Sequence, residues 1–502
     1  MKNNFYKKTI VLMIVVLLCQ AVNLLRDIFL AQSFGASSIN DVYLVSQTII
    51  SIIISMFNSP MATAFVPVVT KYFVSASTID RNRFVSTVYC DVFLFAIVLT
   101  IIEICAVDLL SYMAAPGFST EAKDMLSRLI IIQSPITLIN ILKGINRGNF
   151  QILQKFNICE ISAIFPYVCM CVYLLLPFEP NIFIVAYILS ISTIFSIIPE
   201  FIILYRNGIR FYPQFGLPND IKVIGYLVLA ASITTGIREI NVMFDKTIGS
   251  LLPEGSITML SYASKLTVVV VGLVSTSVSL VGFSNAAVFA NCNEKDKQIQ
   301  NIEKSLNLIN FLIIPIAIFL IVYSHDIVDF LYGGGLFDDS SVKTTSFLMK
   351  LYALGLIGYG FQDVFTRNLH AIKNVKCTLK ASVLMVFINI LLNIVLYKWI
   401  GVYGVAIATS VAILSIIWPL SRDIERYIGK YNKMQIAKNC FLAIVASLSS
   451  ISLVWFFQYN FGDNSFVTLS LSFILSFIIY FMLNLLIKNR VIIDIKNEIL
   501  NN

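Results

Sequence analysis

The sequence predicts an all-α polytopic membrane protein with about 14 transmembrane helices. Of its 502 residues, 58% are hydrophobic and only 13% are charged, about half the share of roughly 25% that is usual in soluble proteins. A spanning helix needs roughly 20 mostly apolar residues, so this composition supplies enough for about fourteen spans. A soluble fold is excluded, because too few polar side chains remain to cover a surface of this size.

Fourteen apolar runs are long enough to cross a bilayer. They lie at 9–31, 40–68, 86–110, 127–146, 158–177, 182–204, 222–247, 256–289, 305–323, 346–370, 381–398, 402–420, 438–457 and 466–487. The first run follows a basic start, as a secretory signal does. It continues without an obvious small-residue cleavage site, so we expect a retained first span.

The segments between these runs differ sharply in their content of Lys and Arg. The two termini and every second loop hold 25 of them, whereas the alternate loops hold only Lys123, Lys343 and Lys398. Because cytoplasmic loops of membrane proteins carry the excess of basic residues, both termini are expected to face the cytoplasm. A miscounted span would disturb the alternation, which therefore supports fourteen spans independently.

A weak internal repeat divides the chain into halves. The first span contains Leu25-Arg26-Asp27-Ile28 and the seventh contains Ile237-Arg238-Glu239-Ile240, each followed by a short loop with a glycine. We therefore expect two six-helix lobes, at 1–212 and 219–428, followed by a C-terminal helix pair at 436–502. Transporters commonly place a binding site at the membrane midplane between such repeats.

Apart from Lys222, Lys398 and Lys438 at the very ends of runs, which are counted with the loops, eight basic residues fall inside the expected spans. Each of the eight costs about 2.5–3.5 kcal/mol if it faces lipid at mid-depth. Three of them, Arg128, Lys143 and Lys350, lie within a turn or two of a span end, and we expect these to reach the membrane surface. Four others lie in spans one, seven and eight, three of them beside an acidic residue. These are Arg26 with Asp27, Arg238 with Glu239, Lys246 with Asp245, and Lys265.

The spacing of these charges favours a cavity over local pairing. Adjacent residues on a helix point about 100° apart, so Arg26 and Asp27 are expected to pair poorly with each other. Residues seven apart share a face, and span seven carries two such pairs: Arg238 with Asp245, and Glu239 with Lys246. The stripe predicts a cationic central site for an anionic substrate; the alternative interpretation is internal ion pairs that hold helices together.

Other classes of function lack their usual residues. The nine cysteines form no CxxC pair, and the two histidines, His325 and His370, have no ligand motif nearby, so we expect no metal, disulfide framework or cofactor. The basic residues form short clusters between apolar runs and not one basic face, which argues against a nucleic-acid partner. The longest external loop, 324–345, is short for the catalytic groups of a membrane glycosyltransferase or glycan polymerase, so we expect no enzyme.

Short segments along most of the chain, in matching order and spacing, carry a family resemblance. They include Leu25-Arg26-Asp27, Phe34-Gly35-Ala36, Ala64–Pro67, Ala115–Phe118, Leu252–Ser256, Tyr262-Ala263, Leu336–Asp338, Tyr352–Leu356 and Gly404–Ser410. In these segments the chain resembles the MurJ (MviN) lipid II flippases, a family within the multidrug/oligosaccharidyl-lipid/polysaccharide exporter superfamily.

The resemblance implies a two-lobed bundle of the bacterial inner membrane whose central cationic cavity alternates access between the two membrane faces. The implied substrate is an undecaprenyl-diphosphate-linked glycan, with lipid II for peptidoglycan as the first expectation. By position, Arg26 matches an essential first-span arginine and Asp41 matches the acid that opens span two. Lys265 stands where the family usually has arginine, and it keeps the charge but not the planar fork that grips phosphate.

Three positions depart from the family pattern and leave the cavity less charged. Gln20 stands where the family often has arginine, Ser51–Ser55 covers the usual site of an arginine pair, and Val268 replaces a glutamate. A related flippase for a capsule or exopolysaccharide unit therefore remains an alternative. A drug or cation antiporter of the same superfamily is a further alternative, although it favours a cavity dominated by carboxylates. The sequence does not specify a coupling ion.

Overall fold

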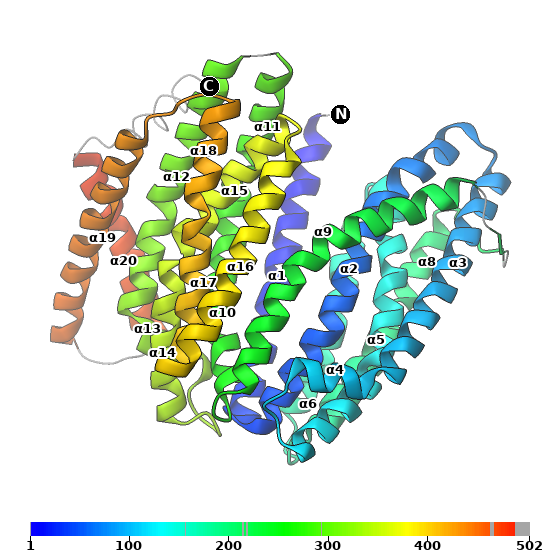
Figure 1. The fold of residues 1–502 in the computed structure, drawn as a ribbon, viewed down its shortest axis with the longest axis horizontal. Coiled ribbons are helices and arrows are strands. Elements are labelled where there is room, and N and C mark those ends of the chain that lie inside the picture. The colour runs from blue at the N-terminus through cyan, green and yellow to red at the C-terminus, as the bar shows by residue number, and fades with distance from the viewer. Residues whose placement is uncertain are drawn as a thin grey trace. The chain divides into compact units, whose positions relative to one another are not determined.

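Every regular element in the described part of the chain is a helix in the computed structural model (Figure 1), which confirms the all-α class. The structure describes residues 2–155, 157–212, 215–216, 219–292, 294–461 and 466–486. The chain divides into two compact units. The first comprises Met1–Thr258 with the short segment Gly335–Phe337, and the second comprises Met259–Gly334 with Asp338–Asn502.

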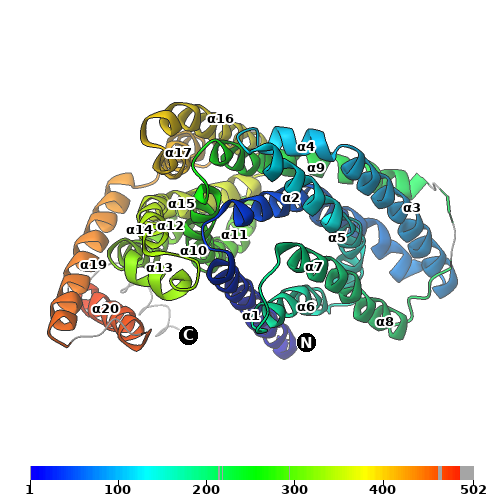
Figure 2. The ribbon, with the colours of Figure 1, turned by 90° about the horizontal axis from the view of Figure 1, so that it is seen from below.

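The first unit contains helices α1 to α9. Their bounds are α1 Lys2–Phe34, α2 Ser38–Ser75, α3 Thr78–Cys105, α4 Val107–Ala114, α5 Thr120–Ile152, α6 Asn157–Leu174, α7 Ile182–Ser196, α8 Ile198–Arg206 and α9 Asn219–Ser250. Within this unit α2 packs along α5 and α9, while α1 lies beside α6 and α6 beside α7 (Figure 2).

The second unit contains most of α10 and the helices that follow. Their bounds are α10 Ser256–Val270, the π-helical turn Val271–Ser275, α11 Thr276–Asn291, α12 Lys295–Val322, α13 Ser324–Tyr332, α14 Asp339–Leu354, α15 Leu356–Ala371, α16 Val375–Ile400, α17 Val402–Ser415, α18 Ile417–Tyr427, α19 Lys433–Phe461 and α20 Phe466–Leu486. In this unit α19 packs against α12 and α20, and α20 also contacts α12.

Twelve helical segments of the described chain are long and apolar enough to cross a membrane. The two other expected runs, 222–247 and 346–370, coincide with α9 and with the consecutive helices α14 and α15, which meet at Gly355. The polytopic fold with about fourteen spans therefore agrees with the sequence. The division into two six-helix lobes and a C-terminal pair stays a prediction.

Local sequence signals place the starts of several helices. The hydroxyl of Ser37 accepts the backbone N–H of Asn40 at the start of α2, and the hydroxyl of Ser119 accepts that of Ala122 at the start of α5. A serine in this position satisfies one of the unpaired N–H groups of a helix start. The expected span at 182–204 breaks at Ile197, and Pro199 lies in the first turn of α8, where its missing N–H costs no helical bond.

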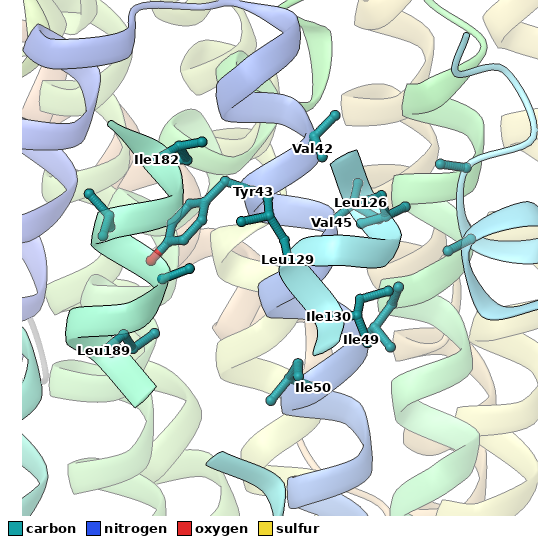
Figure 3. Close-up of a cluster of buried hydrophobic side chains, with 14 of the residues drawn as sticks. Val42, Tyr43, Val45, Ile49, Ile50, Leu126, Leu129, Ile130, Ile182 and Leu189 are labelled. Atoms are coloured by element: carbon teal, nitrogen blue, oxygen red, sulfur yellow. The ribbon is translucent and has the colours of Figure 1, made fainter. Parts of the chain in front are cut away.

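A buried apolar cluster joins α2, α5 and α7 in the first unit (Figure 3). Val42 and Tyr43 of α2 pack with Leu126 and Ile130 of α5 and with Leu189 of α7. In a bilayer the lipid is as apolar as these side chains, so close packing and not water exclusion holds such helices together. The cluster fixes α2 against α5, the two helices that contribute most of the polar residues of the site described next.

Candidate functional site

A polar cavity of about 620 Å³ lies inside the first unit. Its polar lining comes from five helices: Gln47, Ser51, Ser55, Asn58 and Ser59 of α2; Asn140, Lys143 and Arg147 of α5; Cys159 and Tyr167 of α6; Thr193 of α7; and Thr235 and Glu239 of α9. On α2 and α5 these residues recur every three or four positions, the spacing of one helix face. Because unpaired polar groups are costly against lipid, such a face belongs in the interior of a membrane bundle.

Much of the cavity wall is neutral, and its side chains donate to backbone carbonyls of the same helix or of a neighbouring one. The hydroxyls of Ser51 and Ser55 donate to the carbonyls of Thr48 and Ile52, both at 2.9 Å. The side-chain amide of Asn58 donates to the backbone carbonyl of Asn140. A hydroxyl group that donates to a carbonyl of the preceding turn keeps oxygen lone pairs, which can accept hydrogen bonds from a ligand.

Lys143 belongs to a buried ionic network on one side of the cavity. Its ammonium nitrogen Nζ lies 3.7 Å from Oε1 of Glu200 and donates to the hydroxyl of Ser196 at 2.6 Å. Glu200 also accepts from the amide of Asn146, at 2.6 Å, and from the hydroxyl of Ser162. A buried charge is tolerable when it is paired and hydrogen-bonded in this manner.

Arg147 lies one helical turn beyond Lys143 on the same face of α5. Its guanidinium Nη2 is 2.6 Å from Oε1 of Glu160 at the start of α6. The side chains are 40% and 26% exposed, so this pair is more accessible than the Lys143–Glu200 pair. Both cations in the described lining of the cavity therefore have a carboxylate partner inside the first unit.

Arg26 contacts an aromatic residue of the cavity wall. Its guanidinium carbon Cζ is 4.7 Å from the ring centre of Tyr167, which lines the cavity. Its Nε and Nη2 donate to Oδ1 of Asp27 at 3.0 and 2.7 Å. The expectation that these neighbours pair poorly is wrong, because the long, flexible arginine stem reaches around the helix to the adjacent carboxylate.

Asp41, in the first turn of α2, holds the start of α10. Its carboxylate accepts the backbone N–H groups of Gly255 and Thr258, both at 2.7 Å, and the hydroxyl of Thr258 at 2.6 Å. These three donors give Asp41 a structural role in the first unit. Its role toward a substrate stays a prediction.

The remaining predicted site residues are spread over two helices. Glu239 of α9 lines the cavity, whereas Asp245 and Lys246 lie further along α9 and are half-buried. The side chain of Arg238 lies outside the described residues. Lys265 is a half-buried residue of α10 in the second unit. Of the charged stripe expected on span seven, Glu239 is the described residue that reaches the cavity.

Sequence reasoning missed the two cations that line the cavity. The expectation that Lys143 reaches the membrane surface is wrong, since the residue is 8% exposed and paired with Glu200. A signal was available: Lys143 and Arg147 are four residues apart, and two carboxylates, Glu160 and Glu200, lie in neighbouring apolar runs. Among the residues that the structure describes, no group of three or more His, Cys, Asp or Glu side chains could hold a metal ion.

A bundle of apolar helices that encloses a polar cavity is the architecture of a polytopic membrane transporter. Residues 30–477 match the family model described as lipid II flippase MurJ. The chain therefore belongs to the MurJ family, and it is a multi-pass protein of the bacterial inner membrane.

Relatives and solved structures agree with this assignment. The chain is 25% identical over 465 residues, 90% of each protein, to a probable lipid II flippase MurJ of Buchnera aphidicola subsp. Acyrthosiphon pisum (strain APS). It is 25% identical over 411 residues to the Thermotoga maritima protein with the same description, covering 82% of this chain and 83% of the relative.

The fold is shared with two classes of solved transporter. A lipid II flippase MurJ in an inward closed conformation superposes with a TM-score of 0.82 at 24% identity, covering 96% of this chain and all of that one. An inward-facing multidrug resistance MATE family transporter of the MOP superfamily gives a TM-score of 0.67 at 12% identity, covering 84% and 95%.

Proposed function

We propose that the protein is a lipid II flippase, which moves the polyprenyl-diphosphate-linked peptidoglycan precursor from the cytoplasmic to the outer leaflet. The observation that carries this proposal is the polar, charged cavity inside a helical bundle of the MurJ family. A diphosphate and a glycan lose their hydration in hydrocarbon, at a cost that makes unaided passage negligible. A polar cavity that alternates its access between the two membrane faces supplies replacement hydrogen bonds, and no bond of the substrate is made or broken.

The proposed diphosphate-facing cations are Arg26, Arg238 and Lys265. Arg26 has the strongest support, because its guanidinium contacts the ring of Tyr167, a residue of the cavity wall. A guanidinium has five N–H donors, and Asp27 accepts from those on Nε and Nη2. The acidic residues proposed to accompany these cations are Asp27, Asp41, Glu239 and Asp245.

The proposed orientation places both termini in the cytoplasm, as the distribution of Lys and Arg predicts. With the potential positive outside, an anionic headgroup gains about 2.3 kcal/mol per charge per 100 mV as it moves outward. The membrane potential could therefore drive the outward movement of the headgroup without a coupled ion.

Rescue of a cell depleted of its lipid II flippase tests the function. We expect the wild-type chain to restore growth, and Arg26→Ala and Lys265→Ala each to abolish rescue at equal membrane levels. Arg83→Ala and Lys343→Ala are matched controls at exposed positions and should rescue fully. Failure of the well-expressed wild type would exclude lipid II and favour another polyprenyl-linked glycan. Full rescue by both site variants would refute the cationic site.

A further inference from the structure

We infer that the polar cavity of the first unit is the subsite for the uncharged glycan part of the substrate, with the diphosphate held outside it. This inference rests on the proposed function, because it assumes a glycan joined to a lipid through a diphosphate. It assigns the hydroxyl and acetamido groups of the sugars to the cavity wall formed by α2, α5, α6, α7 and α9.

The charges around the cavity do not favour an anion. Lys143 and Arg147 are its two described lining cations, and each is paired with a carboxylate, Glu200 and Glu160 respectively. Glu239 is itself a carboxylate of the described cavity wall. A diphosphate that entered would meet two cations whose charges are compensated by carboxylate partners, together with the carboxylate of Glu239, so the cavity would attract it little.

The neutral groups of the wall suit sugars instead. The hydroxyl of Thr193 on α7 and that of Thr235 on α9 donate to their own helices at 2.7 and 3.0 Å, as Ser51 and Ser55 do on α2. These oxygens can accept from sugar hydroxyls, and the amide of Asn140 can both donate and accept. A glycan loses its hydration on entry, and hydrogen bonds to such groups replace the lost ones.

Apolar surface completes the lining. Ile50 and Ile54 of α2, Leu189 of α7, and Pro166 and Tyr167 of α6 line the same cavity. Sugar rings have C–H faces that pack on such groups while their hydroxyls point sideways. The volume of about 620 Å³ lies within the range of roughly 300–1,000 Å³ that is usual for small-molecule sites.

The position of Arg26 agrees with this assignment. In the substrate the diphosphate is bonded directly to the first sugar, so its binding group must adjoin the glycan subsite. The guanidinium of Arg26 lies on Tyr167, 4.7 Å from the ring centre, and Tyr167 lines the cavity. A cation in contact with a residue of the cavity wall adjoins the proposed glycan subsite, as the binding group for the diphosphate must.

Binding to three lipids that share one polyprenyl tail tests the inference on the full-length protein in nanodiscs. The lipids are undecaprenyl diphosphate without sugar, its monosaccharide-peptide derivative and its disaccharide-peptide derivative. We expect Asn58→Ala/Asn140→Ala to weaken binding of the disaccharide lipid by about tenfold, the loss for two hydrogen bonds. The affinity for undecaprenyl diphosphate should stay within about twofold of wild type, because this lipid has no sugar to occupy the cavity. Ser55→Leu, which narrows the cavity without removing an amide, should also weaken binding of the disaccharide lipid and leave binding of undecaprenyl diphosphate unchanged.

The control double variant Thr63→Ala/Thr70→Ala removes two exposed hydroxyls from the same helix and should bind all three lipids as wild type does. The inference is overturned if the cavity variants weaken undecaprenyl diphosphate as much as the disaccharide lipid, because the cavity would then hold the diphosphate. It is also overturned if monodisperse cavity variants bind the disaccharide lipid normally. A wild-type protein that binds undecaprenyl diphosphate and the disaccharide lipid equally refutes the glycan subsite alone, whereas one that binds none of the three refutes the proposed function as well.

Discussion

Lys143 and Glu200 form a buried ion pair, and the stability of the folded protein depends on the presence of both members. Glu200 is fully buried, and Lys143 is the cation paired with it. Removal of one member of a buried ion pair leaves an uncompensated charge, which typically costs about 3–5 kcal/mol, whereas removal of both costs far less. We therefore expect Lys143→Met to lower the thermal unfolding midpoint strongly, and Lys143→Met/Glu200→Gln to recover most of the loss in detergent.

Lys123→Met provides the comparison at a partly exposed position, where Lys123 contacts the ring of Tyr112 and donates to the carbonyl of Pro116. It should change the midpoint little. Equal midpoints for the single and double variants at Lys143 and Glu200 would show that the pair contributes no coupled stability.

Single residues also mark the limit of prediction from sequence. The apolar runs and the alternating basic loops depend on composition, so the sequence alone reveals them. It does not reveal the partners of Lys143 and Arg147, because Glu200 and Glu160 come from α8 and α6 and meet α5 through packing alone. The role of Arg26 as a site residue stays a prediction. The expectation that it pairs poorly with Asp27 considered only the direction of the two side chains on the helix and not the length of the arginine side chain.

The segment Gly335–Phe337 is a short element of the first unit that docks on the end of α1. The backbone N–H of Leu336 donates to the carbonyl of Gln32 at 2.9 Å. Gly335 has φ +58°, and a Cβ at this position would overlap the carbonyl of Gln32. The neighbouring Gly334 also has a positive φ, +95°, but open space surrounds it. A substitution at Gly334 therefore introduces backbone strain alone, whereas a substitution at Gly335 introduces backbone strain and steric overlap together.

Gly334→Ala should cost about 1–2 kcal/mol, the strain of a left-handed residue. Gly335→Ala should cost more, since it adds a clash that displaces Leu336 from Gln32, and we expect a lower unfolding midpoint and faster proteolysis near residue 335. Equal losses for the two variants would show that the contact with Gln32 adds nothing to stability.

Helix α14 begins with a charged cap outside the apolar runs. Asp338 accepts the backbone N–H of Ser341 at 3.0 Å, and hydrogen bonds from the side chain and backbone of Ser341 hold the pKa of Asp338 below its usual range. A carboxyl whose pKa is lowered by folding stabilises the folded state above its unfolded pKa, and this contribution is lost as the pH falls through the folded value.

Asp338→Ala should therefore destabilise the protein by about 1 kcal/mol at pH 7, the usual value of a helix N-cap. Asp338→Ser should keep most of the cap and remove its dependence on pH below about 4. Unfolding midpoints at pH 7 and pH 3 measure both effects. If the loss caused by Asp338→Ala is as large at pH 3 as at pH 7, the carboxylate is not the capping group.

Over the whole molecule, composition predicted the architecture well because a bilayer leaves few alternatives. Only helices and closed barrels satisfy all backbone hydrogen bonds in lipid, and long apolar runs are helices. The cationic central site stays a prediction, and the charge balance of the cavity in the first unit, where each described lining cation has a carboxylate partner, was not predicted. That balance depends on which carboxylate lies beside each cation. Spacing in the sequence predicts such neighbours only when both residues belong to the same helix.

The run at 346–370 is the place where the count of spans can be tested most directly. It consists of two 16-residue helices, α14 and α15, which are each too short to be counted as a span and which meet at Gly355. If they cross the membrane as one span, the exposed residues Lys343 and Lys376 lie on opposite faces. If they turn back instead, both residues share a face, and every later segment is inverted.

We expect one crossing, with Lys343 outside and Lys376 in the cytoplasm, as the positive-inside rule predicts. In a cysteine-free background, a membrane-impermeant maleimide should label Lys343→Cys in intact cells. It should label Lys376→Cys only after permeabilisation. Labelling of both positions in intact cells would reduce the number of spans by one and place the C-terminus outside. The alternation of basic loops could then no longer support the orientation on which outward flipping depends.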